Sequence, residues 1–368
     1  MSSEPKSRQK HVAVVVGSGF GCRIQIPALK AAGFEVSALV GTDPERTAER
    51  ARANGVPLAF TDLDEAIRQT GATVVTVATP PDTHAPMVHK AIGHGCHVLC
   101  EKPFAMNVAE GRAMLEAAEA AGVIHALGYE FRWDPARAAA ERLIAEGAIG
   151  EPRIATFTQF MHYAGNPYVD LPDWWLNEKS GGGWLGAWGS HLVDWVHTWL
   201  GDFTKLSAAL PSVGTDPGEA EDSYIVRFEL ANGLQGTFQQ SSGAWGPPAA
   251  MNRVAGTRGT LWIEGESVQM ADAEGERTAE IPGEFALPPM PSLSDEDPRR
   301  QTPEWQMLTQ VELPAYIRLC ETLRNAIEGE DQGPVAMATF ADGVRAMVVL
   351  DAIRRSAELG GEQVKIDY

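Results

Sequence analysis

The chain has 368 residues, of which 44% are hydrophobic, and its formal net charge is −19. At roughly 100–200 residues per domain, this length predicts two domains. A chain this acidic repels phosphate backbones and anionic lipids, so neither nucleic acid nor a membrane is an expected partner. The polar start MSSEPKSRQK predicts a disordered tail over residues 1–10 and no signal peptide. We therefore expect a cytoplasmic protein.

Residues 11–130 alternate short apolar runs with amphipathic segments. The expected strands are 11–17, 34–40, 72–79, 97–101 and 123–129, and the expected helices are 24–33, 44–55, 62–71, 84–95 and 107–122. Strands that are almost continuously apolar and separated by helices indicate a parallel sheet covered on both faces. This part of the chain therefore predicts a doubly wound, Rossmann-type α/β domain. Such sheets bind ligands beyond the carboxyl ends of their strands.

The pattern changes over residues 131–368. The expected strands are 153–160, 204–210, 222–230, 234–242 and 256–265, and the expected helices are 135–150, 184–200, 305–328 and 336–358. Strands that follow one another without intervening helices predict an α+β domain with a large, open, mostly antiparallel sheet. The closing helices could pack back on the first domain. The Pro-rich segment 281–303 predicts a loop or a lid.

A glycine-rich turn, VVVGSGFGC, follows the first strand and opens the first helix. Gly17, Gly19 and Gly21, with Phe20 between the last two, allow a tight turn and a close approach to a pyrophosphate. In strict G-x-G-x-x-G spacing the third glycine would be residue 22, which is Cys22. The strand before the turn and the helix after it both favour dinucleotide binding.

The end of the second strand bears on which nicotinamide cofactor is used. NAD sites usually place a carboxylate there, and this chain has Gly41. Asp43 precedes Pro44, which suits the N-cap and first position of a helix, so we expect its own helix to occupy its carboxylate. Thr42 and Arg46 could hold a 2′-phosphate. These residues favour NADP over NAD.

Cys96 and Cys100 lie close to His94 and His97, a grouping that could suggest a metal site. No second pair of ligands completes a set of four, and small cysteines suit a buried strand. We expect no metal.

Several stretches of the chain carry a family resemblance. They are the glycine turn, ATPPDTH (78–84), HVLCEKPF (97–104), GYEFRWDP (128–135), GGGWLGAWGSHLVD (181–194) and DGVRAMVVLDAIRRSAELG (342–360). Together they resemble the Gfo/Idh/MocA oxidoreductases, the glucose–fructose oxidoreductase and inositol dehydrogenase family. The resemblance implies an NAD(P)-dependent dehydrogenase or reductase that moves a hydride between nicotinamide and a secondary alcohol or ketone of a sugar, cyclitol or glycoside. It also implies a homo-oligomer, a dimer or tetramer, assembled through the C-terminal sheet.

The same resemblance assigns roles to the motif at residues 101–103. Lys102 would hydrogen-bond the reacting oxygen, Glu101 would support Lys102 and the nicotinamide ribose, and the Lys102–Pro103 peptide would be cis. The chemistry of the reaction agrees with this role of Lys102, because an alkoxide that develops during hydride loss needs a positively charged hydrogen-bond donor. Thr79 and Pro80 would lie beside the nicotinamide or its ribose, and His84 is either a cofactor neighbour or a structural residue.

His191 is the second catalytic candidate. The family pattern places Asp, His and Asp at positions 187, 191 and 194, and this chain has Ala187, His191 and Asp194. His191 matches the general acid/base of the family, and imidazole suits that role near neutral pH. Without an acid at position 187, His191 would be oriented by Asp194 or by water. The vacated space could admit a bulkier glycoside.

Six of the ten tryptophans fall between residues 174 and 199. Aromatic faces pack against the C–H faces of sugars, and we assign this role to Trp174 and Trp175, with the others in the core. The remaining substrate candidates are Arg132, Tyr163, Asp173 and Asp194.

Two alternatives remain open. Oxidation of a sugar beside its anomeric centre acidifies the neighbouring C–H, so a transient keto-sugar could lead to glycoside cleavage. A non-catalytic NAD(P)-binding regulator on the same fold is the other, and Lys102 and His191 argue against it because a sensor needs no proton path.

Overall fold

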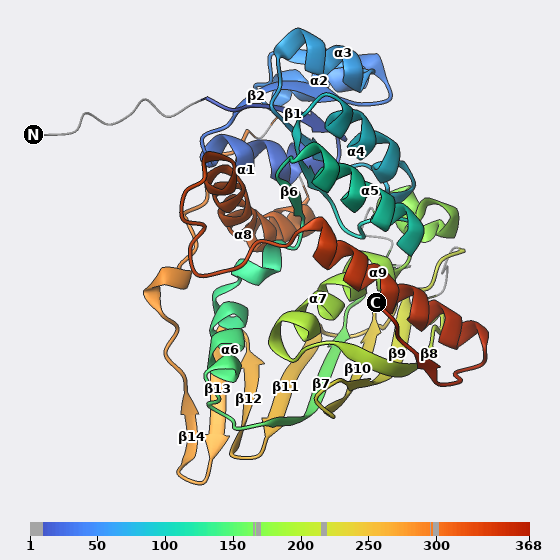
Figure 1. Cartoon of the computed structure of the whole chain (residues 1–368), viewed down its shortest axis with the longest axis vertical. Coiled ribbons are helices and arrows are strands. Elements are labelled where there is room, and N and C mark those ends of the chain that lie inside the picture. Colours follow the sequence, from blue (N-terminus) through green and yellow to red (C-terminus); the bar gives the residue numbers. More distant parts are fainter. Residues whose placement is uncertain (1–9, 165, 167–170, 215–218, 295, 297–301) are drawn as a thin grey trace, which may run out of the picture.

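The structure, a computed structural model, describes residues 10–164, 166, 171–214, 219–294, 296 and 302–368. It contains two sheets, one near each end of the long axis, with helices between them (Figure 1). The tail expected over residues 1–10 lies outside the described residues except for Lys10. Part of the expected loop at 281–303 lies outside them as well.

The first sheet is parallel throughout. Its strands are β1 (Val12–Val16), β2 (Glu35–Val40), β3 (Leu58–Phe60), β4 (Val74–Val77), β5 (His97–Cys100) and β6 (His125–Leu127). Their order is β3-β2-β1-β4-β5-β6, which confirms the doubly wound, Rossmann-type fold. The chain adds β2 and β3 on one side of β1 and then β4, β5 and β6 on the other side, so the strand order reverses between β1 and β4. Folds of this kind bind nucleotides at that point. The three-residue β3 was not expected, because it is too short to carry a pattern.

The helices of this part begin and end where the sequence places caps. They are the π-helical turn η1 (Gly21–Gln25), α1 (Ile26–Ala31), α2 (Pro44–Ala53), α3 (Leu63–Thr70), the short η2 (Pro81–Thr83), α4 (His84–Gly93) and α5 (Val108–Ala121). Asp43, Asp62 and Asn107 cap the starts of α2, α3 and α5 by accepting a hydrogen bond from a backbone N–H. The left-handed residues Gly71 and Gly122 end α3 and α5.

The second sheet has nine strands. They are β7 (Pro152–Phe160), β8 (Phe203–Ala209), β9 (Ser223–Leu230), β10 (Gln235–Ser241), β11 (Ala249–Gly256), β12 (Gly259–Glu264), β13 (Ser267–Asp272), β14 (Gly275–Thr278) and β15 (Val364–Lys365). Their order is β14-β13-β12-β11-β7-β10-β9-β8-β15, and only β7 and β10 pair in parallel. The mostly antiparallel sheet is thus confirmed. The sequence did not predict β11, β13, β14 and β15. Several of these strands are short and lack an alternation of apolar and polar residues.

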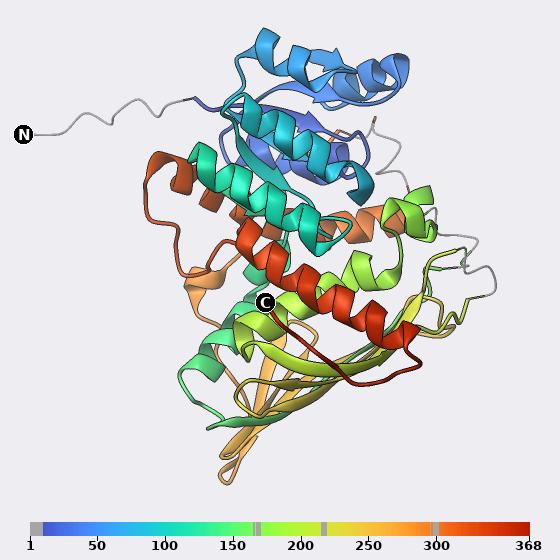
Figure 2. The ribbon, with the colours of Figure 1, turned by 45° about the vertical axis from the view of Figure 1, so that its right-hand side comes forward.

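Helices cover one face of this second sheet. They are α6 (Pro135–Ala145), α7 (Ser190–Trp199) and α9 (Phe340–Glu358), all on the side toward the first sheet (Figure 2). Along β9, Tyr224, Val226 and Phe228 are buried beneath them, whereas Ile225 and Arg227 point to the other face and are exposed. The strand period of two therefore separates a core face from an open face.

The long helix α8 (Pro303–Glu328) returns to the first sheet and packs against η1 and α1. Arg23 on η1 forms an ion pair with Glu312 on α8 at 2.6 Å, and both side chains are largely buried. Phe20 meets the ring of Tyr316 edge-on, with 5.6 Å between the ring centroids. The late helix thereby lies against the glycine turn from the start of the chain.

The cysteines and histidines do not form a cluster. Cys22, Cys96, Cys100 and Cys320 are all buried, and His94 pairs with Asp64. Within the described ranges, no three His, Cys, Asp or Glu side chains gather as metal ligands would. None of the helices seen there has the length and apolar character to cross a bilayer.

Candidate active site

The turn after β1 is shaped to hold a dinucleotide. Gly17 has a φ of 111°, and a Cβ at this position would lie 2.3 Å from the carbonyl oxygen of Ala78, so only glycine fits there. A Cβ on Gly19 would meet no atom within 4 Å, which leaves that backbone open to a ligand. The buried hydroxyl of Thr79, after β4, has no hydrogen-bond partner in the described part of the chain. An open turn and an orphaned hydroxyl at the switch point fit an NAD(P) dinucleotide.

The end of β2 leaves no room for the carboxylate of an NAD site. A Cβ on Gly41 would lie 2.4 Å from Oγ1 of Thr47, which donates a hydrogen bond to the backbone oxygen of Asp43. The Asp43 carboxylate accepts from the backbone N–H of Arg46 at 2.8 Å, so the expected N-cap is confirmed. Thr42 and Arg46 are both exposed beside it.

Arg50, which the sequence did not single out, reaches the glycine turn from α2. Its guanidinium donates to the backbone oxygen of Ser18 at 2.6 Å and to the Ser18 hydroxyl at 3.0 Å. A cation therefore lies between the second strand and the glycine turn. The sequence signal that could have identified Arg50 is its position one helical turn after Arg46.

Lys102 lies in the turn after β5, opposite the segment that leads into α7. The peptide between Lys102 and Pro103 is cis, as the resemblance implied. The Lys102 Nζ donates a hydrogen bond of 2.8 Å to the backbone oxygen of Ala187, in the π-helical turn η6 (Leu185–Gly189) that precedes α7. A π-helical turn of this kind often marks a functional site. The ammonium at the carboxyl end of β5 thus faces the helix that carries His191.

Glu101 is held in a buried hydrogen-bond network behind Lys102. One carboxylate oxygen accepts from Gln25 at 3.0 Å and from the hydroxyl of Tyr316 at 2.5 Å, and the other accepts from the backbone N–H of Lys102 at 3.4 Å. Burial raises the pKa of Glu101, while Lys102 and these donors oppose the increase. Glu101 therefore ties η1 and α8 to the lysine and does not face an open cleft.

His84 joins two loops at the edge of the first sheet. Its ring is fully buried, with Nε2 at 2.9 Å from the backbone oxygen of Thr79 and Nδ1 at 3.3 Å from that of Phe104. Burial lowers the pKa of His84. The ring lies beneath the loops that carry Thr79, Pro80 and Lys102, so its contacts are structural.

His191 lies in an aromatic enclosure with neither ring nitrogen paired among the described residues. The imidazole is 1% exposed, and the rings of Tyr129, Phe131 and Trp188 surround it at centroid distances of 5.5, 5.0 and 5.6 Å. Burial lowers the pKa of His191 well below its ordinary value, and Lys102 and Arg137 add to the effect. Burial therefore favours the neutral form of the imidazole, and both of its nitrogens are unpaired in the described structure.

Asp194 does not orient His191, contrary to one of the two options drawn from the sequence. Its carboxylate accepts from Arg132 Nε at 2.8 Å and from Arg132 Nη2 at 2.5 Å, a bidentate pair with both side chains at most 4% exposed. Arg132 also donates to the backbone oxygen of Ala336 at 3.2 Å. These two substrate candidates thus bind each other and join the turn after β6 to α7.

The tryptophans form a continuous series of ring contacts that leads to His191. Trp174 meets Trp175, Trp175 meets Trp184, and Trp184 stacks on Trp188, with centroid distances of 5.9 Å at each step. The indole N–H groups of Trp184 and Trp188 are buried without a partner in the described ranges. The ring of Tyr163 packs edge-on against Trp184.

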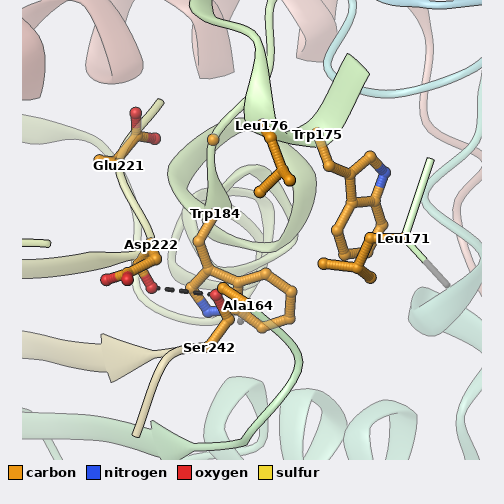
Figure 3. A pocket seen from close by; sticks show the side chains of 9 residues that line it. Ala164, Leu171, Trp175, Leu176, Trp184, Glu221, Asp222 and Ser242 are labelled. Carbon is orange, nitrogen blue, oxygen red and sulfur yellow. Dashed lines mark hydrogen bonds between the residues drawn. The ribbon is translucent and has the colours of Figure 1, made fainter. Parts of the chain in front are cut away.

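A small pocket opens beside this series of rings (Figure 3). Its lining is Ala164, Leu171, Trp175, Leu176, Gly183, Trp184, Glu221, Asp222 and Ser242. In Figure 3 Glu221 and Asp222 lie on the left and the Trp175 ring on the right, with the Trp184 ring between them next to Ser242. Of the predicted substrate residues, Trp175 lines this pocket and Tyr163 packs against its Trp184 ring, whereas Asp173 is exposed on the short turn η4 (Asp173–Leu176).

The comparisons with known proteins agree with this geometry. Residues 11–129 match the model of an oxidoreductase family with an NAD-binding Rossmann fold, and residues 138–262 match the C-terminal domain of the same family. The chain belongs to the Gfo/Idh/MocA family. The fold and the family make it an NAD(P)-dependent oxidoreductase.

Several relatives of this Gfo/Idh/MocA protein have named activities. Levoglucosan dehydrogenase of Pseudarthrobacter phenanthrenivorans is 28% identical over 361 residues, which cover 86% of this chain and 85% of the relative. D-apiose dehydrogenase of Paraburkholderia graminis is 27% identical, with 76% and 74% covered. A solved levoglucosan dehydrogenase in complex with NADH has a TM-score of 0.81 at 26% identity, covering 98% of this chain and all of that one.

Removing one member of the buried Arg132–Asp194 pair tests its structural role. We expect Asp194→Ala to lower the free energy of unfolding by about 3 kcal/mol, because Arg132 would lose its bidentate partner and keep only Asp342, at 3.4 Å, as a counter-charge. Denaturant unfolding measures the change. The matched control is Asp202→Ala, which breaks an exposed pair with Arg345 and should cost at most about 1 kcal/mol. Equal free energies of unfolding for the two variants would contradict the structural role of the Arg132–Asp194 pair.

Proposed function

We propose that this protein transfers a hydride between the nicotinamide of NAD(P) and the carbon of a secondary alcohol or ketone in a sugar, cyclitol or glycoside. The observation that carries the proposal is the position of Lys102, whose ammonium lies at the carboxyl end of β5 and faces the His191 helix. When bound, the nicotinamide supplies or accepts the hydride. Residues of the chain orient the substrate and handle the proton.

Lys102 is the group that meets the reacting oxygen in this proposal. In the structure its ammonium has a backbone oxygen as partner, and a substrate oxygen could replace that acceptor without a new charge being buried. A positive donor stabilises the oxygen as it becomes negative during hydride loss, and a water-excluded site strengthens the effect. Glu101 holds the adjoining backbone, so Lys102 approaches from a set direction.

His191 acts in a different way from the one that the sequence favoured. A neutral imidazole in an apolar enclosure is a weak base, but it is a good hydrogen-bond donor to a polarised oxygen. Its unpaired nitrogens supply that donor or position a water. We therefore assign the main proton transfer to Lys102 and a polarising role to His191.

The substrate class rests on the aromatic series and on the small residue at position 187. Ala187 is 2% exposed beside His191, so the acid found there in the family pattern is replaced by a methyl group. Tyr163 and Trp175, with Trp174 behind, offer ring faces to the C–H surface of a sugar or an aglycone. The named relatives act on levoglucosan and D-apiose, both sugars or sugar derivatives.

The test is a nicotinamide absorbance screen with both cofactors against sugars, cyclitols and glycosides, run in both directions. Product analysis separates simple dehydrogenation from glycoside cleavage, because an intact oxidised sugar indicates the former and a released aglycone the latter. Absence of turnover across the whole panel, with the cofactor bound, would favour the regulatory alternative.

Lys102→Met should abolish most of the activity found in that screen. We expect kcat to fall on the order of 10²–10⁴-fold, the usual value of a lost oxyanion donor or general acid–base group. Lys90→Met, on the exposed face of α4, is the matched control and should retain activity. Steady-state kinetics measure both variants. Undiminished turnover in Lys102→Met would refute the assignment.

We also propose that NADP is preferred over NAD. Gly41 has no space for a carboxylate, the carboxylate of Asp43 is occupied by its helix, and Thr42, Arg46 and Arg50 surround the end of β2. Rossmann folds bind the adenosine ribose in this region, where a cation suits a 2′-phosphate. Arg50 is the best oriented of the three because Ser18 already holds its guanidinium.

Arg50→Ala should weaken NADP binding selectively. Loss of a charge-assisted hydrogen bond costs about 1.5–3 kcal/mol, which corresponds to about 10–100-fold in the dissociation constant for NADP. NAD affinity should change much less. The control is Arg52→Ala, an exposed arginine of the same helix. Fluorescence titration with both cofactors measures the effect, and equal losses for NAD and NADP would argue against a 2′-phosphate contact.

The open face of the nine-stranded sheet supports a homo-oligomer, which we propose as the assembled form. The strand register places Ile225, Gln239, Thr158 and Met251 in one row across β9, β10, β7 and β11. Ile154 lies on the same face of β7, four residues before Thr158, and is 57% exposed. Ile225 and Met251 are also exposed. Apolar side chains spread over a sheet face suit contact with a second copy.

Ile225→Lys should therefore dissociate the oligomer. A charge placed at the centre of this face would be buried unpaired between two copies. Sedimentation velocity measures the change in mass. Val213→Lys replaces another exposed apolar residue, outside the strands, and should leave the mass unchanged. A wild-type protein that sediments as a monomer would contradict the proposed assembly.

A further inference from the structure

Tyr316 is a buried residue of α8 that the proposed mechanism does not yet use. Its hydroxyl donates to a carboxylate oxygen of Glu101 at 2.5 Å and accepts from the side-chain amide of Gln25 at 2.9 Å. The tyrosine is fully buried, and a buried tyrosine usually finds a partner for its hydroxyl. Both partners here belong to the Rossmann-type part of the chain. A residue of a late helix therefore completes a hydrogen-bond network in the first part.

The three side chains form a closed set of hydrogen bonds. Gln25 donates at 3.0 Å to the same oxygen of Glu101 that accepts from Tyr316. The other oxygen of Glu101 accepts from the backbone N–H of Lys102 at 3.4 Å. All three side chains are buried. Glu101 thus accepts three hydrogen bonds in a site that water hardly reaches, and one of them comes from the residue proposed to meet the substrate.

The network has little room to move. A Cβ on Gly128, in the turn after β6, would lie 2.7 Å from the carboxylate of Glu101, so the carboxylate packs directly against that turn. On the other side, the Phe20 ring in the glycine turn meets the Tyr316 ring at a centroid distance of 5.6 Å. The tyrosine is therefore held by its ring on the side of the glycine turn and by its hydroxyl on the side of the lysine.

Titratable groups from several elements face Glu101. They are Lys102 beside it, Cys100 at the end of β5, Glu130 on the short turn η3 (Glu130–Trp133), and Tyr316 and Cys320 on α8. Burial is the dominant influence and raises the pKa of Glu101, while Lys102, Tyr316 and Gln25 lower it. Burial also raises the pKa of Tyr316 well above its ordinary value, so its hydroxyl stays protonated and donates at neutral pH.

We propose that Tyr316 is a positioning residue, whose hydroxyl holds the carboxylate of Glu101 in place and thereby sets the direction of Lys102. The proposal rests on the proposed hydride transfer and adds the residue that orients its acid–base group. Tyr316 neither gives nor takes a proton in the reaction. It acts through Glu101, which accepts from the backbone N–H of Lys102, while the ammonium of that lysine reaches across to η6. A donor that is oriented in advance needs no rearrangement when the reacting oxygen arrives.

Tyr316→Phe separates the hydroxyl from the ring. The phenyl ring keeps the contact with Phe20 and fills the same space, so we expect the variant to fold and to bind the cofactor as before. Glu101 loses one of its three donors. A carboxylate with fewer donors is protonated more easily, and a protonated carboxyl group is a weaker acceptor for the backbone N–H of Lys102.

Infrared difference spectroscopy on the full chain tests this step without cofactor or substrate. The protonated-carboxyl band of Glu101 is the one that is missing in Glu101→Gln. In Tyr316→Phe the midpoint of this band should move to higher pH, because a donor that favours the ionised form is gone. Gln25→Leu removes the other side-chain donor and should move the midpoint in the same direction.

Tyr224→Phe is the matched control. Tyr224 is as deeply buried as Tyr316, and its hydroxyl donates to Gln240 in the second sheet. Its loss should leave the midpoint of the Glu101 band unchanged. A midpoint that is the same in wild type and in Tyr316→Phe would overturn the proposal, and so would an equal shift in Tyr224→Phe.

Kinetics test whether the network matters for the reaction. With an active substrate, Tyr316→Phe should lower kcat on the order of tenfold, less than the 10²–10⁴-fold of a lost acid–base group, with KM and the cofactor dissociation constant unchanged. The acid limb of the kcat profile should move to higher pH, because Lys102 depends on the carboxylate form of Glu101. Tyr224→Phe should keep both kcat and the limb.

The outcomes separate this proposal from the proposed function. A lower kcat at every pH without a shift of the acid limb would indicate a merely structural tyrosine and overturn the positioning role. An unchanged kcat would overturn it too, and either result would leave hydride transfer standing. Wild-type protein without turnover would refute hydride transfer, while the infrared midpoints would still decide whether Tyr316 controls the carboxylate of Glu101.

Discussion

The hydrogen bond between Lys102 and the backbone oxygen of Ala187 joins the two halves of the molecule at the site where chemistry is proposed. Its donor follows a strand of the parallel sheet, and its acceptor precedes a helix that lies on the antiparallel sheet. A lysine brought out of water needs such an acceptor, since an unpaired buried ammonium is costly. The relative position of the two sheets therefore determines where the ammonium lies, and the helices α8 and α9 between the sheets maintain that position.

Three buried polar contacts support this arrangement. Glu101 connects the lysine turn to η1 and α8, the Arg132–Asp194 pair connects the turn after β6 to α7, and His84 joins the loops after β4 and β5. The first two contacts join segments far apart in the sequence. Buried pairs of this kind add little net stability compared with apolar packing, but they penalise arrangements that separate the partners. They are suited to holding a site in one geometry.

The sequence predicted the first sheet well because its strands are buried on both faces and therefore read as continuous apolar runs. It predicted the helix start at Asp43 from this capping residue and the proline that follows it. It could not predict the π-helical turn at Leu185–Gly189, since an extra residue in a helix leaves no pattern in composition. The two-residue β15 depends on pairing with β8, a contact between distant segments that no local pattern encodes.

For the site, the sequence identified the residue types correctly, but their partners depend on distant contacts. Arg132 and Asp194 were chosen as substrate contacts because both are polar and lie in the motifs, yet the fold brings them together. Burial favours the neutral form of His191, and position 187 is an alanine. Lys102 therefore has neither a charged imidazole nor a carboxyl group at these two positions before and on α7.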